Sequence, residues 1–129
     1  MRPSLSTIST DTAPKAIGPY SQAVACGDLV FVSGQIPLDP ATGEMVAGSF
    51  ALQVQRVLDN LDAILMASGC SRSTVLKVNV SVTDLGKFSE LNEVYARFFA
   101  DHRPARAVVG VSALPRGAQV EIEAVAVRL

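Results

Sequence analysis

The residues best suited to chemistry stand in the last quarter of the chain. Arg106 opens a β-branched run over residues 104–112, and Glu121 and Glu123 interrupt a second run over residues 119–127. An arginine guanidinium can bind a planar carboxylate through two parallel hydrogen bonds. A glutamate on a mostly apolar strand is either a satisfied structural charge or a carboxyl group tuned for proton transfer.

Each of these residues also has a structural interpretation. Arg106 could form a surface ion pair, and Glu121 and Glu123 could face solvent on an edge strand, although valines continue the same face. A turn around residues 115–116 predicts that the two runs pair as a hairpin. In that hairpin Arg106 and Glu121 share a face about 13 Å apart along the strand direction. They could flank a small ligand, although a small acid is not expected to touch both, and residues of another chain could complete the site.

Other chemistries find little support. His102 is the sole histidine and stands at a predicted helix end, so we expect a structural role and no metal site. A serine-hydrolase triad, a P-loop and a dinucleotide-binding glycine motif are absent from the sequence. No lysine stands in an apolar setting, which disfavours Schiff-base chemistry. Cys26 and Cys70 are far apart, and we expect two small buried side chains in a reducing compartment.

Composition limits the class of protein further. A length of 129 residues favours one domain spanning residues 1–129. The net charge is −1 with no basic stripe, so no nucleic-acid partner is expected. No apolar run is long enough for a membrane span, and the Ser/Thr-rich N-terminus lacks a secretory apolar segment. We therefore expect a cytoplasmic protein, with a short organellar transit peptide as the alternative.

Hydrophobic patterning predicts the elements that position these residues. A loose arm over residues 1–15 precedes a helix-and-sheet domain. In chain order, the expected elements are strands 22–26 and 29–33, a helix around 54–65, a strand over 75–83, a helix from about 88 capped by Asp84, and the two C-terminal strands. This β-β-α-β-α-β-β order suits an α+β domain with two helices packed on one face of a mixed sheet. With 49% apolar residues, the other face is expected to be covered by a second subunit.

Several stretches share the pattern of a known family. They are Ile17-Gly18-Pro19-Tyr20-Ser21, Val32-Ser33-Gly34-Gln35-Ile36-Pro37, and a C-terminal signature from Pro104-Ala105-Arg106 through Val109, Ser112 and Leu114 to Val120-Glu121-Ile122 and Ala124-Val125-Ala126. On these motifs the chain resembles the RidA (YjgF) family of reactive-intermediate deaminases over nearly its whole length. The resemblance implies a chorismate-mutase-like α+β fold, a homotrimer with clefts between subunits, and no metal or cofactor.

The resemblance also implies an activity. Family members hydrolyse 2-imino acids or their enamine tautomers, such as 2-aminoacrylate/2-iminopropanoate and 2-iminobutanoate, to 2-oxo acids and ammonia. By position, Arg106 would clamp the substrate carboxylate and Glu121 would orient the attacking water. The other substrate-binding positions that the resemblance implies are Tyr20, Ser33, Gly34, Asn92 and the backbone of Val108. The chain departs from some members at Val108, where they carry a cysteine, and in its shorter loop at residues 102–104.

Other functions are compatible with the same scaffold. One is a deaminase of a different pathway intermediate, such as an aminomuconate-type compound. Another is a non-catalytic protein that binds small acids or acts as a holdase. Some family members have been described as ribonucleases or translation inhibitors, which the near-neutral charge argues against here. A mutase function rests on fold analogy alone.

Overall fold

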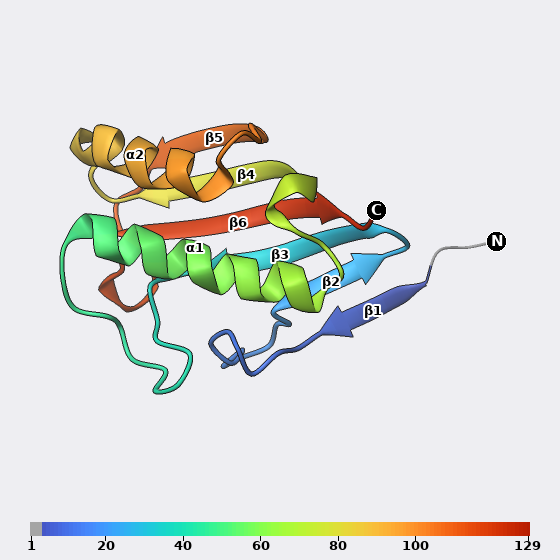
Figure 1. The fold of residues 1–129 in the computed structure, drawn as a ribbon. Helices are drawn as coiled ribbons and strands as arrows, with labels where there is room; N and C mark the ends of the chain where they lie inside the picture. The colour runs from blue at the N-terminus through green and yellow to red at the C-terminus, as the bar shows by residue number, and fades with distance from the viewer. Residues whose placement is uncertain (1–3) are drawn as a thin grey trace.

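The computed structural model describes residues 4–129 as a six-stranded mixed sheet with two helices on one face (Figure 1). The strands lie in the order β1 (Leu5–Ile8), β2 (Ala23–Cys26), β3 (Leu29–Gln35), β6 (Val120–Val127), β4 (Val75–Val82) and β5 (Ala105–Gly110). The helices are α1 (Phe50–Ala67) and α2 (Phe88–Phe99), with short 3-10 turns η1 (Arg72–Thr74), η2 (Leu85–Lys87) and η3 (Pro115–Gly117). The predicted α+β class with two helices on one face is confirmed.

The N-terminal segment is more ordered than predicted. β1 pairs antiparallel with β2, with Leu5 opposite Cys26, so the element order is β-β-β-α-β-α-β-β. The prediction of a loose arm over residues 1–15 is therefore wrong for β1, and residues 1–3 of that arm lie outside the described part of the chain. A four-residue edge strand that is largely exposed on both faces has no burial pattern by which sequence could distinguish it from a loop.

The predicted C-terminal hairpin is also wrong. β5 pairs parallel with β4, whereas β6 runs antiparallel to both β3 and β4. The strand-helix-strand unit β4-α2-β5 explains the parallel pairing, because a helical crossover returns the chain to run beside the preceding strand. β4 thus separates β5 from β6, and the two β-branched runs never meet.

The core lies between the helices and the sheet. Its largest fully buried side chains come from α1, α2 and the covered face of the sheet, and include Val54, Leu58, Leu61, Ile64 and Leu65, then Leu91, and then Val30, Val78, Val80 and Ile122. Each buried aliphatic side chain contributes roughly 1.5–3 kcal/mol. α1 begins at Ser49, whose hydroxyl accepts from the Leu52 amide, and ends before Gly69 at φ 81°, as its glycine predicted.

The start of β4 departs from the predicted alternation. Leu76 was expected on the covered side with Val78, yet 47% of it is exposed while Val75 is buried. The register between β4 and β6 shifts between Val75 and Lys77. Because of this bulge, Val75 faces the core and Leu76 faces outward, the reverse of the prediction. From Val78 onward the predicted alternation of buried and exposed side chains holds.

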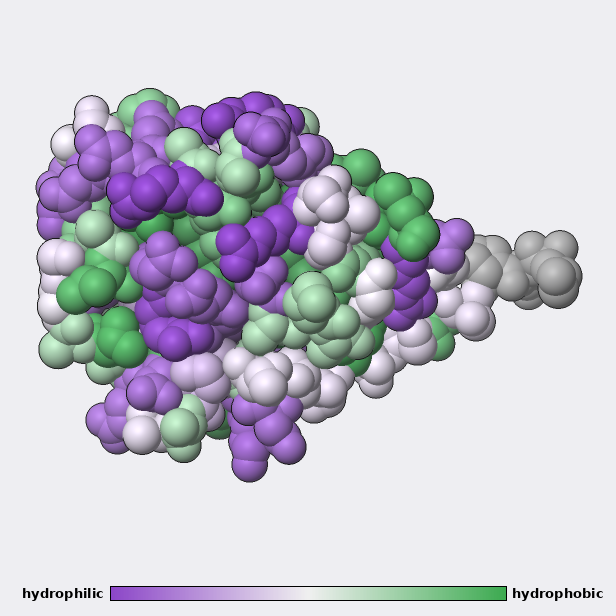
Figure 2. All heavy atoms as spheres, viewed as in Figure 1, coloured by the Kyte–Doolittle hydropathy of each residue, from purple (hydrophilic) through white to green (hydrophobic). Residues whose placement is uncertain are grey.

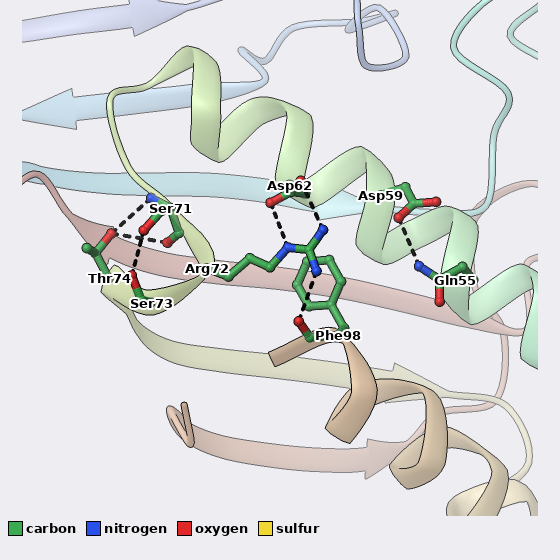
Figure 3. Close-up of polar contacts among 8 residues, drawn as sticks. All are labelled: Gln55, Asp59, Asp62, Ser71, Arg72, Ser73, Thr74 and Phe98. Atoms are coloured by element: carbon green, nitrogen blue, oxygen red, sulfur yellow. Dashed lines mark hydrogen bonds and ion pairs between the residues drawn. The ribbon is translucent and has the colours of Figure 1, made fainter. Parts of the chain in front are cut away.

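One arginine ties the two helices together (Figure 3). Arg72, in η1, pairs with Asp62 of α1 at 3.1 Å and donates to the Phe98 carbonyl of α2 at 3.0 Å. Its guanidinium also lies 4.1 Å from the Phe98 ring centroid. The ion pair, the hydrogen bond and the cation–π contact of Arg72 therefore hold α2 against α1 in addition to apolar packing.

The two faces of the molecule differ. The helix side carries a mixture of polar and apolar side chains (Figure 2), as expected for helices that meet solvent. The opposite face of the sheet has no covering layer among residues 4–129, and Leu29, Phe31 and Val109 are 41%, 50% and 51% exposed. Within the described part of the chain, neither helix combines the length and hydrophobicity needed to cross a membrane.

Candidate functional site

A cavity of about 560 Å³ gathers four of the residues predicted to form the site. Tyr20, Ser33, Gly34 and Glu121 all line it. The segment before β2 forms part of its wall, and buried Gln22 anchors that segment by donating to the Pro14 carbonyl at 2.7 Å. The cavity therefore has a fixed rim built by a stretch that the sequence analysis treated as loose.

Gly34 and Glu121 are in direct contact in this cavity. The register between β3 and β6 shifts between Val32 and Gln35, so Ser33 and Gly34 lie at an irregular point of the ladder. A Cβ atom on Gly34 would lie 2.9 Å from both Cδ and Oε2 of Glu121. Gly34 is thus required by the close approach of a carboxyl group, since its φ lies outside the left-handed region.

The environment of Glu121 favours its protonated form. Burial raises the pKa of its carboxyl group above the ordinary value of 4.5, and the charge of Glu123 raises this pKa further. Beside it, the Ser33 hydroxyl donates to the Ser21 carbonyl at 2.5 Å, which links β3 to the Tyr20 segment. A half-buried carboxyl group in a preformed cavity is a candidate for proton transfer.

Arg106 lies in a different place. Its side chain contacts α2, where Nη1 donates to Asn92 Oδ1 at 2.8 Å. Its guanidinium carbon lies 4.8 Å from the Tyr95 ring centroid and 5.6 Å from that of Phe88. A second cavity of about 360 Å³ is lined by Asn92, Tyr95 and Arg106 together with Ala96, Arg103 and Pro104. Within residues 4–129 the one ion pair joins Arg72 and Asp62, so the alternative that Arg106 is ion-paired is wrong.

Arg106 and Glu121 do not share a face, contrary to the hairpin prediction. In the register of the sheet Arg106 lies opposite Val78, and Val78 lies opposite Ala124. Val78 and Ala124 are both buried under the helices. Glu121 is level with Ser81 on the open face. Side chains of directly opposed residues project to the same face, so Arg106 and Glu121 project to opposite sides of the sheet. One chain therefore holds two separate groups of candidate site residues.

The remaining predicted positions fall in one of these two groups or in the core. Asn92 holds Arg106, as described above. Val108 is level with Val80 and packs its side chain against the core, so its side chain is structural. His102 contacts the Val75 carbonyl through Nε2 at 2.7 Å, which agrees with the structural role expected for it. Cys26 and Cys70 are both free; Cys70 is buried and Cys26 is partly exposed.

Two groups of site residues were missed by the sequence analysis. Lys15 and Arg116 line the larger cavity, and Arg116 donates to the Gly43 carbonyl at 2.8 Å from a backbone at φ 57°. Tyr95 and Phe88 contact Arg106. Their spacing with Asn92 along one face of α2 could have indicated a shared target, but only a structure identifies that target as Arg106.

The fold and these two groups of residues define a class of α+β protein with a carboxyl-lined cavity and an arginine that contacts one helix. A sequence model of the family described as endoribonuclease L-PSP matches residues 10–128. The chain is 58% identical to the protein DfrA of Myxococcus xanthus over 93% of each chain. It is 46% identical to the human 2-iminobutanoate/2-iminopropanoate deaminase, over 94% of this chain and 88% of that protein.

A solved structure agrees with these relatives. E. coli TdcF, crystallised with bound serine, superposes with a TM-score of 0.91 at 46% identity, covering 96% of this chain and 99% of that one. The chain belongs to the RidA (YjgF) family. The family resemblance found in its motifs is therefore confirmed.

Proposed function

We propose that this protein hydrolyses small reactive 2-imino acids, such as 2-iminopropanoate and 2-iminobutanoate or their enamine tautomers, to 2-oxo acids and ammonia. The observation that carries the proposal is the Glu121 carboxyl group, which is half-buried against Gly34 in a preformed cavity and has a raised pKa. The name of the human relative supports the substrate class.

The proposed chemistry needs few groups. A 2-imino acid is electrophilic at carbon 2, so water can attack once it is oriented and deprotonated. Glu121 takes a proton from that water as the C–O bond forms and the C=N π bond breaks, and it returns this proton to the nitrogen. In the resulting carbinolamine Glu121 moves the hydroxyl proton to the amine, so that ammonia leaves as the C–N bond breaks and the carbonyl forms. A carboxyl group whose pKa is raised is suited to both accepting and returning the proton.

Arg106 is proposed to bind the carboxylate of the substrate. Within residues 4–129 its bond from Nη1 to Asn92 is the one hydrogen bond of the guanidinium, so the edge formed by Nε and Nη2 is free for two parallel bonds to a carboxylate. The serine bound to E. coli TdcF also carries a carboxylate, which is consistent with a site of this kind.

We propose that the complete site forms between two copies of the chain in a homotrimer. Arg106 and Glu121 project to opposite faces of one sheet, so a small substrate reaches both only if they come from different copies. The uncovered face with Leu29 and Phe31 supplies apolar area for such a contact. A head-to-tail contact that closes into a ring gives identical shared sites.

Other functions have weaker support. A different imino acid, including an aminomuconate-type intermediate, would use the same groups and is separated from the proposal by substrate assays. A non-catalytic holdase would not need Glu121 in a cavity. The family model's description names an endoribonuclease, but a net charge of −1 disfavours an RNA site.

A coupled assay tests the activity. Threonine dehydratase generates 2-iminobutanoate, and the rate of 2-oxobutanoate release is measured with and without this protein. We expect a faster release with the wild-type chain and at least tenfold less acceleration with Arg106→Ala. Equal rates with and without the wild-type protein would refute the proposed reaction.

A mixing experiment tests the shared site. Arg106→Ala and Glu121→Gln chains, each inactive alone, are mixed in equal amounts, dissociated and reassembled. Random assembly pairs an intact Arg106 with an intact Glu121 at about a quarter of the interfaces, so about a quarter of the wild-type activity should return. No recovery, in mixtures that native mass spectrometry finds to contain mixed oligomers, would place both residues of each working site in one chain.

A further inference from the structure

The Arg106 side chain lies against a single stripe of helix α2. Phe88, Asn92 and Tyr95 are spaced four and three residues apart, which places them on one face of the helix. Asn92 accepts from Nη1, while the Tyr95 and Phe88 rings lie 4.8 and 5.6 Å from the guanidinium carbon. One helix face therefore contacts the guanidinium by a hydrogen bond and by two aromatic rings.

These contacts leave a defined part of the guanidinium free. The hydrogen bond to Asn92 occupies Nη1, which is the nitrogen outside the edge formed by Nε and Nη2. Aromatic rings beside a guanidinium restrain its plane without consuming any of its donors. An arginine restrained in this way has a fixed direction for the edge that can bind a carboxylate bidentately.

The ring and the hydroxyl group of Tyr95 have different surroundings. The residue is 7% exposed, and its hydroxyl has no hydrogen-bond partner among residues 4–129. A buried hydroxyl without a partner costs stability, so it does not explain the contact with Arg106. The ring is the part of Tyr95 that contacts the guanidinium.

We propose that Tyr95 is a positioning residue for Arg106, and that its ring, with Phe88 and Asn92, fixes the guanidinium edge that binds the substrate carboxylate. The proposal rests on the proposed function of Arg106 as the carboxylate clamp. It adds a residue that acts through Arg106 and does not touch the reacting atoms. Phe88 is the more distant ring and contributes less.

The chain offers a matched control in Phe98. It is also an aromatic residue of α2, it is 4% exposed, and its ring lies 4.1 Å from another arginine, Arg72 (Figure 3). Tyr95→Leu and Phe98→Leu both remove a buried aromatic ring beneath an arginine. Their losses of stability should therefore be similar, whereas only Tyr95→Leu acts on Arg106.

The experiment measures binding of 2-oxobutanoate, the mobility of the Arg106 Nε–H group by NMR relaxation, and thermal stability. Tyr95→Leu should weaken 2-oxobutanoate binding about three- to thirtyfold, the range expected for losing one cation–π contact, and should increase Arg106 mobility. Phe98→Leu should leave both unchanged. Tyr95→Phe should keep wild-type affinity and melt at a higher temperature, because it retains the ring and removes the unpartnered hydroxyl.

Several results would overturn the proposal. Unchanged Arg106 mobility in Tyr95→Leu would show that the ring does not position the guanidinium. An equal loss of affinity in Phe98→Leu would show a general packing effect, and a loss in Tyr95→Phe would assign the role to the hydroxyl. Failure of the proposed function is distinguishable, because 2-oxobutanoate would then bind Arg106→Ala as tightly as the wild-type protein.

Discussion

Gly34→Ala tests whether the position of the Glu121 carboxyl group controls the rate. The new methyl group would lie 2.9 Å from Cδ and Oε2, and ordinary contact begins near 3.4 Å, so the carboxyl group must retreat by about 0.5 Å. A displacement of about 1 Å at a catalytic group can cost roughly 100-fold, so half of that displacement should cost about tenfold in kcat/KM. The fold should remain, because Gly34 does not have a positive φ.

A second glycine gives the control for this experiment. A Cβ atom on Gly110 would meet Leu85 Cδ1, also at 2.9 Å, but Leu85 is 54% exposed and can turn into solvent. Gly110→Ala should therefore keep its activity within about twofold in the coupled imine assay. If Gly34→Ala were as active as Gly110→Ala, the close approach of Glu121 to Gly34 would have no part in catalysis.

Three further predictions concern single groups. Arg106→Ala should lose 10–100-fold or more in kcat/KM, because each charge-assisted hydrogen bond to the substrate contributes about 1.5–3 kcal/mol. Arg106→Lys should restore little of this loss, since an ammonium cannot form the two parallel bonds to a carboxylate. Near-wild-type rates in either variant would contradict the proposed role of Arg106 in binding the substrate carboxylate. Because burial raises the pKa of Glu121, the stability that its protonated form contributes at low pH is lost as the pH rises through the pKa of the folded state. Glu121→Gln should therefore have a higher melting temperature than the wild type at pH 7, and this difference should disappear below about pH 4.5. A difference in melting temperature that is constant with pH would argue against burial as the cause of the shift. Cys26→Ser/Cys70→Ser should fold and keep its deaminase rate, and an inactive folded variant would reveal a thiol step.

Periodicity was sufficient for the parts of the fold that have one buried face. α1, α2 and most of β4 follow from apolar side chains at helical or alternating spacing, and Gly69 ends α1 as expected. These elements are predictable because burial on one face selects the residue pattern directly. The bulge before Val78 was not predictable, since one extra residue in a ladder leaves no distinct pattern in the sequence.

The pairing of the C-terminal strands could not be predicted from local sequence patterns. Two β-branched runs joined by a short Pro/Gly-containing segment suit a hairpin, and nothing within residues 104–127 excludes one. What decides the outcome is β4, which takes β5 on one side and β6 on the other. Which distant strands pair with each other is decided by the whole fold, so the predicted register, which placed Arg106 and Glu121 on one face, was wrong.

The candidate site residues were also predictable only in part. The family motifs identified Tyr20, Ser33, Gly34 and Glu121, and the structure brings all four to one cavity. The resemblance also identified Asn92, but the contacts between Arg106 and α2 were not predicted, because contacts between a strand and a crossover helix depend on how the helix lies on the sheet.

Two arginines beside α2 differ in geometry, and this difference supports the binding role proposed for Arg106. Arg72 and Arg106 each lie beside an aromatic ring of the same helix. Arg72 also donates Nε and Nη2 to Asp62, so the edge that could hold a carboxylate is already filled by one. Arg106 has an uncharged amide as its single hydrogen-bond partner among residues 4–129, and that amide binds Nη1. The first arrangement is complete within the chain, whereas the second has its carboxylate-binding edge unused, and an unused edge held in a fixed direction is what recognition of a small carboxylate requires.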